Sequence, residues 1–415
     1  MSDKKVKVNF VQSNQEDDFD LSHEDYYEGV EIDRETLEER ARKRTRKTLN
    51  RLILLALVLA ALIAFFVNKD NLTIENISNW IKTNITGTFV GDGFPVTVTG
   101  SNVSSRNFTS NEGNVAVLSD TSFNIIKENG SELLNHRHSF ANPKMANRDN
   151  NYIIYSIGGI NFTVVNENEN IYEYTTNDKI TTADISSKGN YAIATQPIDF
   201  NSSLYVYLED GDLKFTYDFA KGYITAIKLD EKGEKGMVAI TDAENGKIYS
   251  EIYVFDFNLP NPTSIYRCED TIFTHISYNG NMDFYLIGDK KLVRSNGVNF
   301  TEYDYEDKHL TAVSNNNDKT LISLTSYLGD GPCEVLVFDD SIKPKKISTE
   351  NKVEAITASN SSVAVLINNQ VYLYDNNQNL IKNVSAGYDT KNIAMLGTKQ
   401  VYALGLREIR MIDIK

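Results

Sequence analysis

The sequence predicts an all-β ectodomain folded as an eight-bladed β-propeller, placed after a single transmembrane helix and a disordered or helical cytoplasmic tail. Three observations support this prediction: an apolar run at residues 52–67, a strand pattern that repeats from residue 94 onward, and a final module that lacks its last strand. Repeats of about 40 residues with several short strands each are typical of propeller blades. A seven-bladed ring is the alternative.

The apolar run at residues 52–67 contains no polar side chain and is the only such run in the chain. As a helix it would cover about 24 Å of a hydrocarbon core of about 30 Å, and the flanking Arg51 and Lys69 can extend the span. A core helix is disfavoured because the run is apolar on every side. A cleaved signal peptide is disfavoured because the leader is too long and no Ala-x-Ala site follows. We expect an uncleaved anchor at residues 52–68.

Basic residues crowd the N-terminal side of this run. Because Lys and Arg accumulate on the cytoplasmic side of membrane spans, we expect a cell-membrane protein with a cytoplasmic N-terminus and an extracellular C-terminal domain. Trp80 is expected at the membrane interface on the other side. The basic side chains expected to contact the lipid bilayer are Arg40, Arg42, Lys43, Arg44, Arg46, Lys47 and Arg51.

The segments around the anchor differ in composition. Residues 1–32 are acidic and poor in apolar side chains, so we expect a disordered cytoplasmic tail. Residues 33–51 contain acidic and basic residues four apart, which predicts a basic juxtamembrane helix. In residues 69–93 isoleucines recur at three- and four-residue spacing, which predicts an amphipathic linker helix. The acidic tail is either a docking peptide or, more simply, a solvated segment.

From Phe94 onward the chain repeats a module of short strands with a period of 36 to 48 residues. Each module has an alternating strand that is followed in most modules by a polar turn, and a nearly all-apolar strand before it that is typical of burial on both faces. The alternating strands begin at Phe123, Phe162, Leu204, Ile252, Leu292, Val335, Val371 and Ile409. The apolar strands begin at Val115, Tyr152, Tyr191, Met237, Phe284, Leu321, Val363 and Val401. A further, first strand is visible at Ile180, Ile224, Phe273, Leu310 and Val353.

The two ends of the repeat region complement each other. The eighth module ends soon after its third strand, whereas a spare strand at residues 94–100 precedes the first module. Pairing these two strands would close the ring and leave no open sheet edge. We therefore predict eight blades within residues 94–415.

The module pattern resembles the quinoprotein-like and WD40-like propellers, without the Trp-Asp signature of the latter. The order of charged tail, single anchor, linker with Trp80, Gly-Asp-Gly-Phe-Pro at 91–95 and propeller is similar to an uncharacterised family of membrane-anchored propeller proteins from Gram-positive anaerobic bacteria. The resemblance implies a location in the cell envelope and no particular mechanism.

The chain is acidic, with a formal net charge of −15, and the excess of acidic residues lies almost wholly after residue 51. Such a domain would repel nucleic acids and anionic polymers, so we expect no nucleic-acid partner. A neutral or cationic ligand, or one bridged by a metal ion, remains compatible. The two cysteines, Cys268 and Cys333, imply no disulfide framework.

Sequence motifs of common enzymes are absent, including GxSxG, HExxH, CxxC and GxxxxGK[ST]. His136 and His138 could place two imidazoles on one face of a strand, but an exposed polar face is the simpler interpretation. His275 and His309 are interpreted as structural or channel-lining. A quinone-dependent dehydrogenase is disfavoured because those propellers carry recurring tryptophans, whereas Trp80 precedes the repeats. We expect no catalytic residues, no metal site and no cofactor.

These observations favour a non-enzymatic binding or scaffold protein of the cell envelope, with a protein or glycan ligand. The alternatives are a cell-wall glycan hydrolase or lyase, and a transmembrane sensor that signals through the tail.

The longest predicted loops point to a binding face. Loops between second and third strands share one propeller rim with the connections between blades, and this rim should face outward because Phe94 begins a fourth strand that enters from the opposite rim. Three of these loops are extended, at residues 196–203, 242–250 and 326–334, and long loops on a rigid scaffold commonly carry binding residues. Their acidic and aromatic groups suit sugar stacking or a cationic partner. The candidate binding residues are Asp199, Phe200, Asp242, Tyr327 and Asp330.

Overall fold

The computed structural model describes residues 93–414 except Asn281, Asn317, Asp318, Asp340 and Lys399. The chain divides into two compact units, Met1–Thr88 and Phe89–Lys415, and the described residues belong to the second. The predicted tail, juxtamembrane helix, anchor and linker helix therefore lie outside the described residues. In the part of the chain that is described, no helix is long and apolar enough to cross a membrane.

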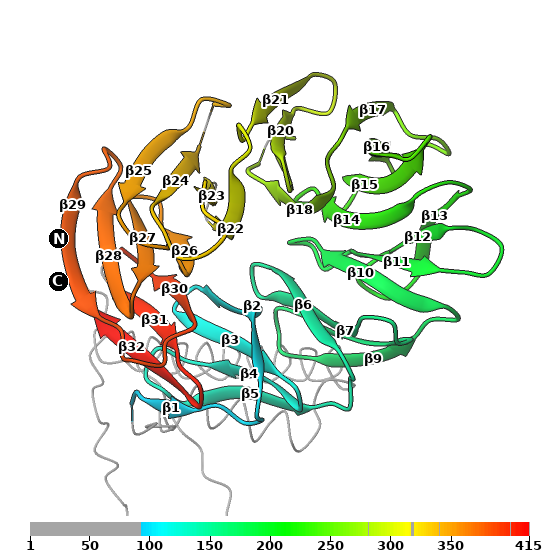
Figure 1. Cartoon of the computed structure of the whole chain (residues 1–415). Helices are drawn as coiled ribbons and strands as arrows, with labels where there is room; N and C mark the ends of the chain where they lie inside the picture. Colours follow the sequence, from blue (N-terminus) through cyan, green and yellow to red (C-terminus); the bar gives the residue numbers. More distant parts are fainter. Residues whose placement is uncertain (1–92, 281, 317–318, 340, 399, 415) are drawn as a thin grey trace, which may run out of the picture. The chain divides into compact units, whose positions relative to one another are not determined.

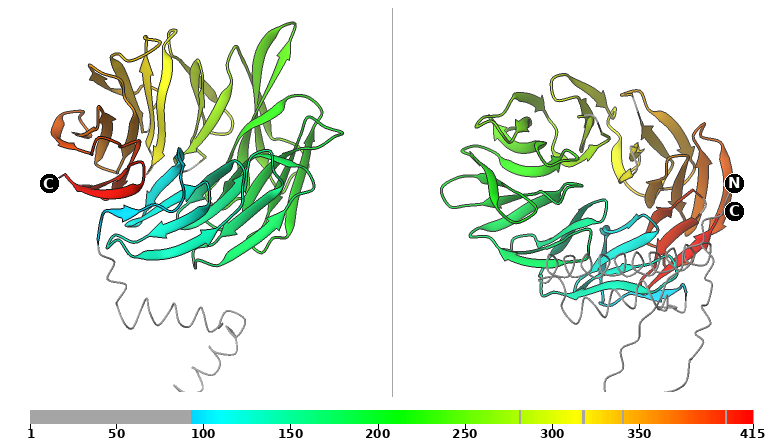
Figure 2. Two further views of the ribbon diagram at one scale, coloured as in Figure 1. Left: turned by 60° about the horizontal axis from the view of Figure 1, so that its bottom comes forward. Right: turned by 180° about the vertical axis from the view of Figure 1, so that it is seen from behind.

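Eight four-stranded antiparallel sheets form the blades of a β-propeller, as predicted (Figure 1). In each blade the first strand, here called the inner strand, lies nearest the centre of the ring. The same ring is seen from behind in Figure 2. Neighbouring inner strands contact one another around most of the ring, for example β10 with β14 and β26 with β30. Polar groups on these strands can therefore meet at the centre.

The first four blades follow one another along the chain. Blade 1 contains β2 (Val103–Asn111), β3 (Asn114–Ser119), β4 (Ser122–Ile126) and β5 (Glu132–Arg137). Blade 2 contains β6 (Pro143–Arg148), β7 (Asn151–Ser156), β8 (Asn161–Val165) and β9 (Ile171–Thr175). Blade 3 contains β10 (Lys179–Ile185), β11 (Tyr191–Gln196), β12 (Ser202–Tyr207) and β13 (Leu213–Phe219). Blade 4 contains β14 (Tyr223–Leu229), β15 (Lys235–Glu244), β16 (Lys247–Asp256) and β17 (Ser264–Glu269).

The remaining blades continue in the same order. Blade 5 contains β18 (Phe273–Tyr278), β19 (Phe284–Gly288), β20 (Lys291–Ser295) and β21 (Phe300–Asp304). Blade 6 contains β22 (His309–Asn316), β23 (Lys319–Thr325), β24 (Cys333–Phe338) and β25 (Lys345–Thr349). Blade 7 contains β26 (Ala355–Ala358), β27 (Ser362–Ile367), β28 (Gln370–Asp375) and β29 (Leu380–Ser385). Blade 8 contains β30 (Asn392–Leu396), β31 (Gln400–Leu404) and β32 (Glu408–Asp413).

The fourth strand of blade 8 comes from the start of the repeat region, which confirms the predicted ring closure. β1 (Val96–Thr97) pairs antiparallel with β32 through Val96 with Ile409 and Thr97 with Glu408. This strand is shorter than the predicted span of 94–100. Pro95 has no amide proton to extend the pairing, and Gly100 adopts a φ of 108° as the chain turns toward β2.

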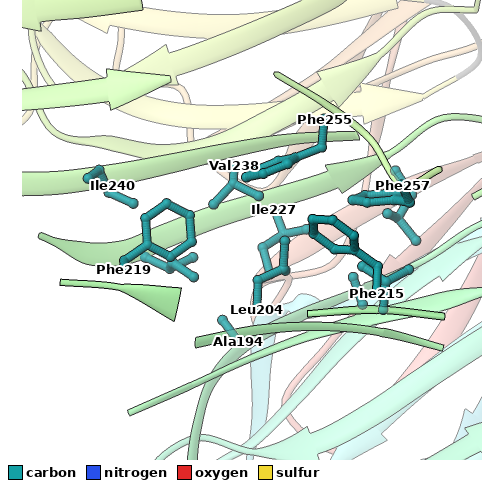
Figure 3. Packing of buried hydrophobic residues seen from close by; sticks show 13 residues of the cluster. Ala194, Leu204, Phe215, Phe219, Ile227, Val238, Ile240, Phe255 and Phe257 are labelled. Carbon is teal, nitrogen blue, oxygen red and sulfur yellow. The ribbon is translucent and has the colours of Figure 1, made fainter. Parts of the chain in front are cut away.

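The core lies between the faces of adjacent blades. All six residues of β7 and of β27 are buried, which agrees with the prediction that the second strands are covered on both faces. Figure 3 shows one such layer, in which Phe215 and Phe219 of blade 3 pack against Phe255 and Phe257 of blade 4. Cys268 and Cys333 are both free and buried, so this core is not held by a disulfide between them.

The inner strands carry a recurring bulge near their first residues. The register shifts at Thr181, Thr225, Thr274 and Thr311 in blades 3 to 6. The Thr181, Thr225 and Thr311 hydroxyls donate to carbonyls of the neighbouring second strand at 3.3, 3.3 and 3.1 Å. A bulge re-aims the side chains that follow it. The inner strands of blades 1, 2 and 8 escaped the sequence analysis; β6, for example, has no fully buried residue.

Candidate functional site

The propeller has two rims with different connections. The loop rim carries the loops between second and third strands and the connections between blades, and the turn rim carries the other turns. Gly93, the first described residue, lies at the turn rim. A side-chain carbon at Gly130, in the turn between β4 and β5, would come within 2.6 Å of the Gly93 carbonyl oxygen. The chain thus enters the propeller at the rim opposite the predicted binding loops.

Two of the three predicted long loops are present on the loop rim. Residues 197–201 connect β11 and β12, and residues 326–332 connect β23 and β24. In the first loop, Asp199 is exposed and Phe200 is 40% exposed. The backbone of this loop is tied to the blade by Asn201, whose amide donates to the Phe219 carbonyl at 3.1 Å.

The prediction of a loop at residues 242–250 is wrong. β15 continues to Glu244 and β16 begins at Lys247, with Asp242 paired to Tyr249 across the extended hairpin. Asn245 and Gly246 have φ angles of 53° and 77°. An Asn-Gly pair with positive φ at both positions favours a two-residue hairpin turn rather than a loop. Asp242 therefore lies on a strand of this hairpin.

The Asp242 carboxylate belongs to a polar cluster rather than to an open surface. The Tyr249 hydroxyl donates to it at 3.3 Å, and the Arg267 guanidinium lies 3.7 Å from the centre of the Tyr249 ring. Arg267 in turn pairs with Glu244 at 2.9 Å and Glu269 at 2.7 Å. These hydrogen bonds raise the pKa of Arg267. Asp242 is half-buried and helps to stabilise the hairpin.

The loop of blade 6 is held in a defined conformation. The Thr325 hydroxyl donates to the Pro332 carbonyl at 2.8 Å and accepts from the Tyr327 amide at 3.2 Å. A side-chain carbon at Gly331 would lie 2.7 Å from the Tyr327 ring, so this glycine allows the loop to fold tightly. Tyr327 is left 54% exposed, and Asp330 pairs with Lys352 at 3.4 Å.

The five predicted binding residues do not form one cluster. Asp199, Phe200 and Asp242 lie on the adjacent blades 3 and 4, whereas Tyr327 and Asp330 lie on blade 6, beyond blade 5. Within the described part of the chain, no hydrogen bond or ion pair joins any two of them. They share a rim and not a pocket.

The loop rim also exposes apolar side chains that the sequence analysis missed. Ile198 and Tyr388 are 99% exposed and Leu328 is 94% exposed. On the turn rim the exposed large apolar side chains among the described residues include Leu259 and Val298 in turns, and Ile171, Leu213 and Leu380 at the first positions of fourth strands. Some of the missed residues on the loop rim lie in short loops beside a glycine. An apolar residue next to a glycine is the sequence signal that could have identified them. The large apolar residues exposed on the loop rim are Ile160, Ile198, Phe200, Tyr223, Ile248, Tyr327, Leu328, Tyr388 and Leu406.

The sequence profile of a family of unknown function, DUF5711, matches residues 95–326, more than half of the chain. The chain belongs to the DUF5711 family. No curated protein sequence matches it.

Solved structures align with this DUF5711 propeller at low sequence identity. A eukaryotic initiation factor aligns with a TM-score of 0.51 and 12% identity, over 75% of this chain and 85% of that one. BamB from Moraxella catarrhalis aligns with a TM-score of 0.44 and 13% identity, over 77% and 93%. The Cps50 (Swd1) β-propeller domain of Myceliophteria thermophila aligns with a TM-score of 0.45 and 11% identity, over 78% and 100%. At these identities the likeness concerns the fold.

Two histidines and one cysteine of the DUF5711 propeller that could carry out chemistry contact neighbouring side chains. Among the described residues, no group of three or more His, Cys, Asp or Glu side chains is placed to hold a metal ion. His136 faces Glu173 at 3.6 Å, and His138 stacks on Phe140. Burial and the neighbouring Glu302 raise the pKa of the Cys268 thiol to about 12. This thiol is protonated at neutral pH and unsuited to nucleophilic attack.

Proposed function

We propose that the protein is a single-pass membrane protein of the cell envelope whose propeller binds a partner protein through the loop rim without catalysing a reaction. The observation that carries this proposal is the near-complete exposure of large apolar side chains on the loop rim. The three most exposed large apolar side chains among the described residues, Ile198, Leu328 and Tyr388, all lie on the loop rim. Concentrated exposed apolar surface marks interaction sites on soluble domains.

The chemistry of the rim favours a protein over a glycan. Sugars stack on flat aromatic rings, whereas the most exposed rim residues include the aliphatic Ile198 and Leu328. Aliphatic side chains gain most from packing against apolar groups of another protein. Because the chain carries a net charge of −15, the partner should be neutral or basic at its contact surface.

The position of Gly93 supports an outward-facing loop rim. The chain enters the propeller at the turn rim, where Gly93 meets Gly130. If the apolar run at residues 52–67 is the membrane anchor, the turn rim is the one tethered toward the bilayer. The loop rim is then free to meet a partner at a distance from the membrane.

Charged substitutions on the loop rim should abolish partner binding without unfolding the propeller. The triple variant Ile198→Asp, Leu328→Asp, Leu406→Asp should lose cross-linking to its partner in intact envelopes. Its melting temperature should stay within about 2 °C of the parent, because these side chains are mostly exposed.

The matched control places the same charge on the turn rim, as the triple variant Leu213→Asp, Leu259→Asp, Val298→Asp. This control should retain the cross-link to one discrete partner, identified by mass spectrometry. Loss of the cross-link in the control alone would assign binding to the turn rim and contradict the proposal.

The anchor makes a separate prediction about topology. A tag after Lys415 should be digested by protease added to intact cells, and a tag before Met1 should be protected, because the basic cluster at residues 40–51 retains the N-terminus in the cytoplasm. Immunoblotting of both tags measures this. Protection of the C-terminal tag with digestion of the N-terminal one would reverse the topology, and detergent lysis serves as the control for access to both.

A further inference from the structure

Three basic side chains lie on inner strands near the loop rim. They lie at the same height, which here means the same position along the axis of the ring. Lys144 on β6 pairs with Tyr155, and His275 on β18 pairs with Ile287. Each partner is the last-but-one residue of its second strand. In blade 1 the same height falls in the wide bulge between Val103 and Phe108, which contains Arg106. The strand register therefore places Arg106, Lys144 and His275 around the centre of the ring at one level.

The neighbouring inner strands carry short, uncharged side chains at this level. The first residues after the bulge in blades 3, 4 and 6 are Thr182, Ala226 and Ala312, which have short side chains. In Figure 1, β2 and β6 lie on one side of the ring centre and β18 on the other. Solvent reaches Arg106, which is exposed, and also reaches the half-buried Lys144 and His275.

The same two strands meet across the ring at the turn rim. Arg148, the last residue of β6, places its guanidinium 4.7 Å from the centre of the Tyr278 ring at the end of β18. Its Nη1 also donates to the Tyr278 carbonyl at 3.3 Å. This contact between blades 2 and 5 bridges the ring at the turn rim. A ligand for Lys144 and His275 would therefore approach from the loop rim.

The polar groups at this level are poorly partnered. Within the described residues, the Arg106 guanidinium makes no hydrogen bond and no ion pair. Among the residues that the structure describes, the Lys144 Nζ has one partner, the Ser104 hydroxyl at 3.5 Å. The Nδ1 of His275 lies 3.0 Å from the Thr274 hydroxyl, and its Nε2 has no hydrogen-bond partner among the described residues. An unpartnered guanidinium offers five donors in a geometry that suits phosphate or carboxylate oxygens.

The electrostatic environment of Arg106, Lys144 and His275 also favours a bound anion. Although the Arg106 side chain as a whole is exposed, the protein atoms around its guanidinium partly desolvate it and lower its pKa. Burial, and then the Arg106 charge, lower the pKa of Lys144 and bring the pKa of His275 to about 4. No carboxylate is among the causes acting on these three groups. Cations that are partly desolvated and repel one another without an acidic partner carry an energetic cost, which a bound anion would offset.

We infer that Arg106, Lys144 and His275 form a binding site for a small multivalent oxyanion, of the phosphate-ester or the di- or tricarboxylate class. Arg106 provides bidentate hydrogen bonds, Lys144 provides a point charge, and the neutral His275 provides a donor through Nε2. A small anion fits better than an anionic polymer, because the acidic chain would repel a long polyanion. This site is independent of the partner-binding role proposed for the loop rim.

Titration calorimetry on the full-length chain in mild detergent tests this inference with two probes, pyrophosphate and citrate. We expect at least one probe to bind the parent and to raise its melting temperature. Arg106→Gln with Lys144→Gln should weaken that affinity by about tenfold or more, because both charge-assisted contacts are lost. The control Arg137→Gln with Lys188→Gln removes the same charge from exposed positions on the outer strand of blade 1 and on a turn, and should bind as the parent does.

The two probes and the variants separate the possible outcomes. Binding of pyrophosphate alone assigns the phosphate class, and binding of citrate alone assigns the carboxylate class. Without ligand, the double variant should melt at or above the parent temperature because it removes repelling charges. If it does not fold, the near-isosteric Lys144→Met variant replaces it in the same titration. Equal affinity in parent and variant, or no binding of either probe at millimolar concentration, would overturn the inference.

Discussion

Deletion of residues 94–100 is expected to lower the melting temperature of the propeller by about 10 °C or more, through a loss of several kcal/mol. The deletion removes β1 and leaves the hydrogen-bonding edge of β32 unpaired. It also removes Phe94, Val96 and Val98 from the cluster between blades 8 and 1. Complete burial of such side chains contributes about 1.5–3 kcal/mol each, and Val98 is 8% exposed. Calorimetry of the purified chain measures the change.

Two neighbouring residues of β1 provide the matched control for ring closure. Val96 packs on the cluster that contains Tyr402 and Ile409, whereas Thr97 is exposed on the other face of the same strand. Val96→Asp should therefore lower the melting temperature strongly and Thr97→Asp only slightly. A deletion variant that melts within about 2 °C of the parent would show that residues 94–100 do not close the ring.

Removal of the Asp184 carboxylate should destabilise the propeller by about 3–5 kcal/mol, because it breaks a buried ion pair and leaves the Lys228 charge alone. The Lys228 Nζ lies 2.7 Å from the Asp184 Oδ1, and the side chains are 8% and 4% exposed. The Asp184 Oδ2 also accepts the Leu229 amide at 2.8 Å, so the substitution Asp184→Ala leaves a second donor unsatisfied. These bonds join the inner strands of blades 3 and 4. Urea denaturation measures the free energy of unfolding.

A surface pair of the same length shows whether burial causes this effect. Lys290 and Asp270 also lie 2.7 Å apart, but their side chains are 54% and 78% exposed. Lys290→Ala should lower the free energy of unfolding far less than Asp184→Ala does, as is typical of solvated pairs. The double substitution Asp184→Leu with Lys228→Met should recover much of the loss from Asp184→Ala, since no charge remains buried. Similar costs for Asp184→Ala and Lys290→Ala would contradict the assignment.

The repeat, the blade number and the ring closure were predictable because they rest on local patterns. The second and third strands of every blade are recognisable by apolar residues that pack between blades, as in β7 and β27. The hairpin at Asp242 was missed although Asn245-Gly246 is a turn signal in the sequence. The sequence predicts a loop here because the strand residues beyond Thr241 are mostly exposed and carry no core pattern.

The sequence by itself determined the propeller architecture, because strand periodicity and the spare strand at Phe94 are local features of the amino-acid sequence. Only the tertiary structure decided which side chains share the loop rim and which share the centre of the ring. Arg106, Lys144 and His275 come from blades 1, 2 and 5, and their common height depends on bulges and register in three separate sheets. Arg106, Lys144 and His275 are not fully buried, so no apolar pattern marks these positions in the sequence.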